Sequence, residues 1–122
     1  MECPKCDGEM DRVSETPLFI DRCRQCHGLY FDQLNRALVT QDGITTGVDS
    51  GDTGLGAEYD QMVFVDCPKC LRMMDQRLVE GPLRVRFEHC PSCQATFLDA
   101  GEFSTYLQDD YREAFLGLLP EA

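Results

Sequence analysis

Four short stretches of this sequence repeat one pattern, in which two residues separate a pair of cysteines. They are Cys3-Pro4-Lys5-Cys6, Cys23-Arg24-Gln25-Cys26, Cys67-Pro68-Lys69-Cys70 and Cys90-Pro91-Ser92-Cys93. The gap between the first two stretches is 16 residues, and the gap between the last two is 19 residues. A tight turn that carries such a pair supplies two sulfurs, and a hairpin of this length brings two turns together around one tetrahedral metal ion. The sequence therefore predicts two metal sites, one formed by Cys3, Cys6, Cys23 and Cys26 and the other by Cys67, Cys70, Cys90 and Cys93.

The metal predicted at each site is Zn²⁺, giving two ions per chain. Four thiolates in a tetrahedral arrangement are the ligand set of structural zinc sites. Iron uses the same four sulfurs, and spacing alone does not separate the two metals.

Two other uses of cysteine compete with metal binding. Eight cysteines in 122 residues would suit a disulfide-linked secreted protein. However, the stretch from Met1 to Cys6 has no basic, apolar or small-residue leader, so we expect a cytoplasmic location and reduced thiols. Thioredoxin-like redox chemistry needs a single cysteine pair at the head of a helix in a βαβ unit, whereas strand-like segments separate the paired motifs here.

Size and charge limit the remaining possibilities. The chain has 22 acidic and 11 basic residues, with a formal net charge of −11. This balance disfavours nucleic acid as a partner, and no apolar run is long enough to span a membrane. Each half of the chain is too small to build a sufficient apolar core, so a metal would take over part of that role.

The chain contains an internal duplication. Met10-Asp11 recurs as Met74-Asp75, and Tyr30-Phe31-Asp32 recurs as Phe97-Leu98-Asp99. The predicted organisation is a first zinc ribbon with a short helix at 1–40, an acidic Gly-rich linker at 41–61, a second zinc ribbon at 62–104, and the continuation of a C-terminal amphipathic helix at 105–122.

Local patterns indicate the secondary structure of each copy. Alternation of apolar and charged residues over 83–88 predicts a half-buried strand. Asp99 and Glu102 have the spacing of a capping box, in which each would bond the other's backbone amide at the start of a helix. Apolar residues then recur at helical spacing over about five turns: Phe103, Tyr106, Leu107, Tyr111, Ala114, Phe115 and Leu118. We therefore predict a small, metal-stabilised α+β fold of two zinc ribbons, each a β-hairpin with zinc knuckles followed by a helix, the C-terminal helix being the longer.

These motifs resemble the prokaryotic zinc-ribbon domains grouped with the transcription factor IIB-type zinc fingers, whose pattern is CPxC, a hairpin, then CxxCxGxWxDxGEL. In the first copy the resemblance rests on both cysteine pairs, Pro4, Gly28 and Asp32; in the second, on both pairs, Pro68, Asp99, Gly101, Glu102 and Phe103. It covers most of 1–40 and 66–104 and implies metal binding in both copies. Tyr30 and Phe97 stand where the family has tryptophan, Leu34-Asn35 replaces the GE step in the first copy, and Ala95 replaces a glycine in the second.

Other residues have a structural and a functional interpretation. His27 and His89 adjoin ligand cysteines but are predicted to be surface residues of the knuckles, because four cysteines already complete each site. Asp32, Asp99 and Glu102 are interpreted as helix caps rather than catalytic carboxylates. Met10 and Met74 are predicted to pack in the ribbon cores. A catalytic zinc needs an open coordination position, so we predict that the protein is not an enzyme.

Two functional hypotheses remain. The first is a non-enzymatic protein-interaction adaptor, with regulation as one of its roles, in which the end of the C-terminal helix, Tyr111 to Leu118, binds a protein partner or a second copy. The second is a transcription-related nucleic-acid-binding protein that uses a cluster of arginines on the second hairpin. The members of that cluster are Arg72, Arg77, Arg84 and Arg86.

Overall fold

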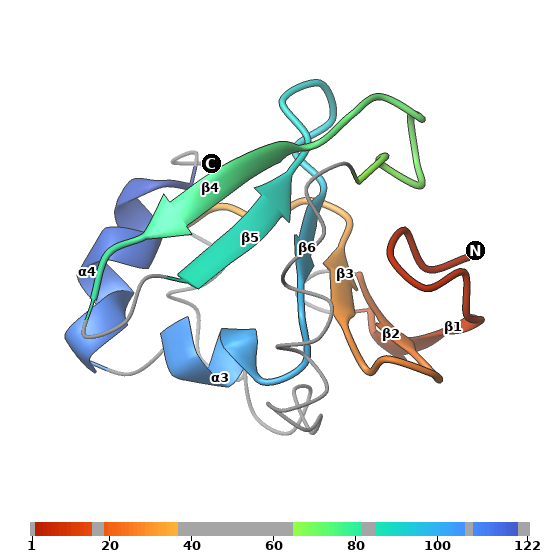
Figure 1. Cartoon of the computed structure of the whole chain (residues 1–122), viewed down its shortest axis with the longest axis horizontal. Helices are drawn as coiled ribbons and strands as arrows, with labels where there is room; N and C mark the ends of the chain where they lie inside the picture. The colour runs from red at the N-terminus through yellow and green to blue at the C-terminus, as the bar shows by residue number, and fades with distance from the viewer. Residues whose placement is uncertain (1, 16–18, 37–64, 82–84, 107–108, 120–122) are drawn as a thin grey trace.

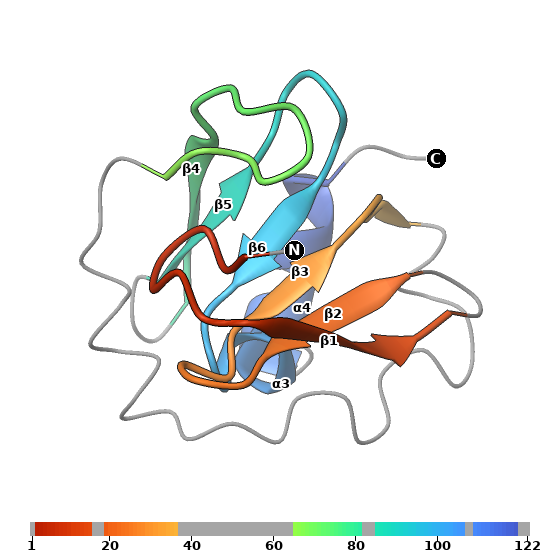
Figure 2. The ribbon, with the colours of Figure 1, turned by 90° about the vertical axis from the view of Figure 1, so that its right-hand side faces the viewer.

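A computed structural model describes residues 2–15, 19–36, 65–81, 85–106 and 109–119 of the chain. Within these ranges the chain forms a six-stranded antiparallel sheet with two helices on one side of it (Figures 1 and 2). The elements are β1 (Met10–Ser14), β2 (Ile20–Cys23), β3 (Leu29–Phe31), β4 (Asp75–Val79), β5 (Val85–His89), β6 (Thr96–Leu98), α3 (Glu102–Tyr106) and α4 (Asp109–Gly117). The strands lie in the order β1-β2-β3-β6-β5-β4. The first copy therefore supplies one half of the sheet and the second copy the other half.

The two halves meet where β3 pairs with β6. Tyr30 pairs with Phe97 at the centre of this contact, and Leu29 pairs with Leu98 on one side. On the other side Phe31 pairs with Thr96. Since the strand Leu29–Phe31 corresponds in the duplication to Thr96–Leu98, the contact has a pseudo-two-fold axis that passes between Tyr30 and Phe97. Sequence analysis described the two ribbons as modules joined by a linker. The structure shows in addition that they pair as neighbouring strands of one sheet, through β3 and β6.

The sheet has an apolar core on each face, because neighbouring side chains of a strand point to opposite sides. Leu29 and Phe31 face the helices, whereas Tyr30 between them faces the cysteines. The buried residues on the helix side are Ile20, Leu29, Phe31, Leu34, Val79, Phe87, Leu98, Phe103, Tyr106, Tyr111, Phe115 and Leu119. On the other side, the cysteines pack with Met10, Tyr30, Val65, Met74, Ala95 and Phe97. The predicted core positions of Met10 and Met74 are confirmed.

The C-terminal segment differs from the single long helix predicted from its apolar spacing. The rings of Tyr106 in α3 and Phe115 in α4 are stacked, with centroids 4.7 Å apart. In one straight helix these residues would be separated by about 13 Å along the axis. The helices α3 and α4 are therefore not parts of one straight helix but pack against each other, and residues 107–108 lie outside the described ranges.

The packing of α4 buries the apolar residues from Tyr111 onward, which the sequence analysis assigned to an interface. Phe115 is fully buried and Tyr111 is 6% exposed, both within the core on the helix side of the sheet. The prediction that the segment from Tyr111 to Leu118 extends beyond its ribbon is therefore wrong, because α4 covers the sheet of its own chain. The binding of a protein partner remains a prediction.

Several predicted features lie at or beyond the limits of the described residues. The linker at 41–61 falls outside them, as does the remainder of the short helix expected in the first copy after residue 36. Neither described helix has the length and apolar character needed to cross a lipid bilayer.

Candidate metal centres

All four cysteine-bearing turns have the same backbone structure. In each turn the amide of the first cysteine donates to the carbonyl five residues later, over 2.7–3.0 Å. The amide four residues later donates to the carbonyl of that cysteine, over 2.8–3.1 Å. The residue directly after the second cysteine adopts a left-handed conformation with a positive φ. These residues are Asp7, His27, Leu71 and Gln94. The same backbone hydrogen bonds therefore recur in all four turns and hold each pair of cysteines within one tight turn.

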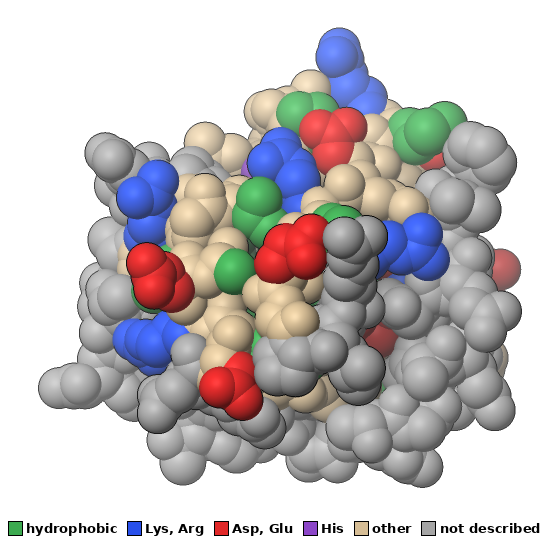
Figure 3. Space-filling view, turned by 60° about the vertical axis from the view of Figure 1, so that its left-hand side comes forward, with side chains coloured by type: hydrophobic (Ala, Val, Ile, Leu, Met, Phe, Trp, Pro, Cys, Tyr) green, Lys and Arg blue, Asp and Glu red, His purple; other side chains and the backbone are tan. Residues whose placement is uncertain are grey.

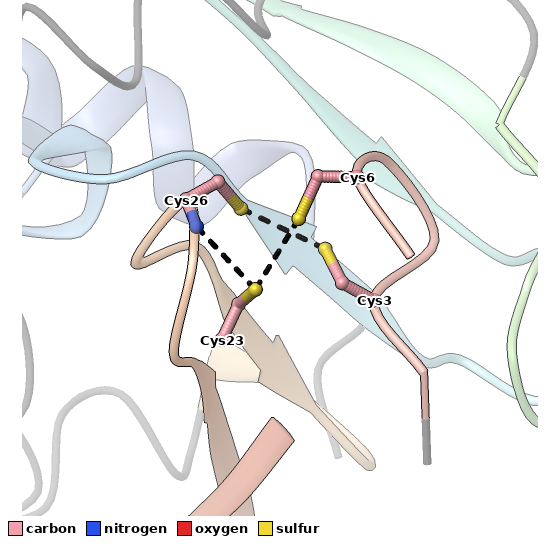
Figure 4. A group of neighbouring side chains, drawn as sticks. All are labelled: Cys3, Cys6, Cys23 and Cys26. Atoms are coloured by element: carbon pink, nitrogen blue, oxygen red, sulfur yellow. Dashed lines mark hydrogen bonds between the residues drawn. The ribbon is translucent and has the colours of Figure 1, made fainter. Parts of the chain in front are cut away.

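The turns bring the eight cysteines together in two groups of four. In each group the sulfurs lie within 4.8 Å of one another, and all eight thiols are free of disulfides. Figure 4 shows the four sulfurs of the first group directed toward one another. The sulfurs of Cys3 and Cys26 are 3.7 Å apart, and those of Cys70 and Cys90 are 3.3 Å apart. Four sulfurs at about 2.3 Å from a tetrahedral zinc ion would be about 3.8 Å apart, so each group could hold a metal ion with small adjustments.

The thiols within each group differ in their affinity for protons. In the first group, the contact with Cys26 lowers the pKa of Cys3 to about 5, and the same contact raises the pKa of Cys26. In the second group, burial opposes ionisation of Cys90, but hydrogen bonds from the backbone of Cys93 and from Cys70 outweigh it and lower the pKa to about 7. Burial raises the pKa of Cys93 to about 12. Metal must displace protons from the thiols with raised pKa, so binding is expected to weaken in acid.

Aromatic rings of both copies pack in the buried cluster that contains the cysteines. A Cβ atom added to Gly28, in the first copy, would lie 2.3 Å from the ring of Phe97 in β6. No other residue type fits at Gly28 without displacing this ring. The corresponding ring, Tyr30, packs in the same core as Cys67 and Ala95 of the second copy. Burial, followed by the charge of Asp32 and then of Cys67, raises the pKa of Tyr30, so its hydroxyl remains protonated.

Three ion pairs also cross between the copies. Lys5 of the first cysteine turn contacts Asp99 at 2.7 Å and also pairs with Glu88, and all three side chains are at most 2% exposed. The equivalent lysine of the second copy, Lys69, lies 3.2 Å from Asp32, with exposures of 44% and 36%. The same residue types thus form a buried ion cluster on one side of the pseudo-axis and a solvated pair on the other. Sequence analysis missed this role, although the repeated lysine in both CPKC turns was its signal.

The remaining candidate residues occupy structural positions. His27 is half-buried, whereas His89, predicted to be a surface residue, is only 4% exposed and its Nδ1 lies 3.0 Å from the Thr96 hydroxyl. Glu102 accepts a hydrogen bond from the Asp99 amide at 2.8 Å, which confirms that half of the capping box. The other half differs, because the Glu102 amide bonds the backbone carbonyl of Asp99 while the carboxylate of Asp99 contacts Lys5.

Paired cysteine turns at the ends of antiparallel hairpins define the zinc-ribbon class of metal-binding modules. Residues 2–35 match the family model described as a transcription factor zinc-finger, so the resemblance seen in the sequence is confirmed for the first copy. The second four-cysteine group, at 67–93, is consistent with a second zinc-ribbon site. No curated protein and no solved structure matches the chain.

Proposed function

We propose that this protein is a zinc-binding, tandem zinc-ribbon adaptor that acts by binding other proteins and has no catalytic activity. The observation that carries the proposal is that four cysteines are available to each metal ion and most of them are buried. A structural zinc ion takes all four ligands from the protein, whereas a catalytic zinc ion retains a position for water or substrate. The metal ions therefore stabilise the fold, and the protein surface carries out the function by binding partners.

The surface offers apolar groups suited to protein contacts. Large apolar side chains are exposed on both copies, and the two most exposed adjoin the first cysteine turn of the second copy. These side chains are Phe19, Leu71, Met73 and Leu78. Single exposed apolar residues are common in soluble proteins, but neighbouring ones mark candidate interfaces.

Nucleic-acid binding is the second candidate function, and the placement of the arginines supports it less. Arg77 lies opposite Phe87 in the β4–β5 pairing, so it shares the face of Phe87. Arg86 lies opposite Leu78 and donates to Gln76, which places it on the other face. The predicted cluster is thus divided between two surfaces, and Arg84 lies outside the described residues. In Figure 3 basic side chains are scattered among acidic ones on the face shown.

Affinity capture from cell extract tests the proposed function. The zinc-loaded chain is used as bait, with and without nuclease treatment of the extract, and a chelator-treated sample serves as the control for folded structure. We expect the same protein partners to be captured with and without nuclease. Loss of every partner after nuclease treatment would instead support the nucleic-acid hypothesis.

A further inference from the structure

A groove of about 550 Å³ lies between the first cysteine turns of the two copies, which face the viewer in Figure 2. We call it the knuckle groove. Its lining consists of Glu2, Cys3, Pro4, Asp7, Asp66, Cys67, Pro68 and Leu71. These residues are equivalent in pairs across the duplication, so the groove follows the pseudo-two-fold arrangement of the sheet. Its volume lies within the range of pockets that hold a ligand or several side chains of a partner.

The knuckle groove is strongly negative. Glu2, Asp7 and Asp66 line it, and no lysine or arginine of the described residues does so. Cys3 and Cys67 belong to the two metal groups, and a Zn²⁺ ion bound by four thiolates leaves a net charge of −2 at each. The lysines of both turns are engaged by carboxylates elsewhere, Lys5 by Asp99 and Glu88 and Lys69 by Asp32. The negative charge of the groove thus favours a positively charged ligand.

An apolar side chain at the edge of the groove adds a second requirement. Leu71 is 79% exposed and has a φ of 64°, a left-handed conformation that a bulky residue rarely adopts. Its equivalent in the first copy is Asp7, a residue type that tolerates this conformation well. Met73, two residues further on, is 56% exposed. A strained and exposed leucine beside two prolines is a candidate contact for an apolar side chain of a partner.

We propose that the knuckle groove binds a basic peptide segment of a partner protein, in which an apolar side chain lies between lysine or arginine residues. The apolar side chain contacts Leu71 and the prolines, and the cations pair with the carboxylates. The proposal rests on the adaptor function and specifies the chemistry of the partner.

Fluorescence anisotropy with short labelled peptides tests this proposal on the zinc-loaded full chain. The probe is a peptide of lysine, arginine and leucine, and its reference replaces each leucine by serine at unchanged charge. We expect the leucine peptide to bind at least about tenfold more tightly than the serine peptide, a difference of about 1.4 kcal/mol. Equal binding of the two peptides would reveal non-specific charge attraction and overturn the proposal.

Three variants locate the binding site. Leu71→Asn is expected to weaken peptide binding about tenfold while retaining the turn, because asparagine tolerates a positive φ. The matched control is Gln94→Asn, which introduces the same residue at the equivalent position of a turn outside the groove, and it should leave binding unchanged. The double variant of Glu2→Gln and Asp66→Asn should weaken binding and reduce its dependence on salt. Metal content is measured for each variant, and unchanged binding by Leu71→Asn with both ions retained would overturn the proposal.

Protein capture and peptide binding by the wild-type chain separate this proposal from the adaptor proposal. If the wild-type chain captures proteins but does not bind the leucine peptide, the groove proposal is wrong and the adaptor proposal stands. If the chain captures no protein, the adaptor proposal is wrong whatever the peptide does. Sedimentation tests a second copy as occupant, and a dimer that Leu71→Asn converts to a monomer would overturn the basic-peptide proposal.

Discussion

Replacing Lys5 by methionine should destabilise the protein far more than the same change at Lys69. Lys5 is the cation of the buried ion cluster, and its replacement removes the positive charge that Asp99 and Glu88 contact in the interior. Breaking a buried pair in this way costs about 3–5 kcal/mol, compared with about 5–15 kcal/mol for the total stability of a typical domain. The exposed pair of Lys69 and Asp32 is of the kind that contributes about 0–1 kcal/mol.

Urea unfolding at a fixed concentration of free zinc measures the difference. The two lysines occupy equivalent positions of the duplicated sequence, so each variant serves as the control for the other. A double variant of Lys5→Met with Glu88→Gln should recover part of the loss, because it removes the negative charge of one of the two carboxylates that Lys5 contacts. Equal unfolding free energies for Lys5→Met and Lys69→Met would refute the reasoning.

The ion cluster also predicts a dependence on pH. Burial alone would lower the pKa of Lys5, but the charges of Asp99 and Glu88 outweigh it and raise the pKa above its ordinary value near 10.5. Lys5 therefore holds its proton more tightly in the folded state than in the unfolded state. The resulting stabilisation is complete below the unfolded pKa and is lost as the pH rises through the folded value. The stability difference between wild type and Lys5→Met should accordingly shrink in strongly alkaline solution.

Three further predictions follow from the packing. Elemental analysis of reduced protein should find two zinc ions per chain, and Cys3→Ser should reduce zinc affinity at both sites, because the two centres share one core; full retention of the second site would contradict this. Gly28→Ala should destabilise the chain by about 1–3 kcal/mol through its clash with Phe97. Gly117→Ala should not destabilise it, because a Cβ added there would meet no atom outside its own stretch of helix within 4 Å, and thermal unfolding measures both variants. Phe115→Ala should cost about 3–5 kcal/mol in urea unfolding, because the ring is fully buried. An unfolding midpoint equal to that of the wild type would contradict the burial of α4 in the core.

The parts of the structure that the sequence predicts are those governed by local spacing. Four CxxC turns place their own sulfurs, because the backbone hydrogen bonds of each turn involve only neighbouring residues. The hairpin that ends in β5 follows from alternation over a few residues. The two cysteine groups thus follow from local spacing, and the strand predicted over 83–88 overlaps β5 at Val85–His89.

The pairing of β3 with β6 has no comparable signal, since it joins residues about 67 positions apart and each strand contains only three residues. The sequence also fails to predict that α3 and α4 are separate helices, for a similar reason. An apolar stripe with helical spacing describes one long helix as well as two helices that fold back on each other. The stacking of the Tyr106 and Phe115 rings in the structure distinguishes two packed helices from one long helix. Long-range packing, rather than local preference, decides both cases.

The symmetry of the β3–β6 contact has a consequence for how such a chain could arise. A contact in which each residue pairs with the equivalent of its partner is isologous, so two identical single-ribbon chains could form it as a homodimer. Fusing the two subunits into one polypeptide removes the requirement that they remain identical. The two halves of this chain do differ, since Lys5 lies in the interior while Lys69 lies in solvent, and glycine at position 28 is matched by alanine at position 95. One half can then specialise in holding the molecule together, which leaves the other free to diversify at its surface.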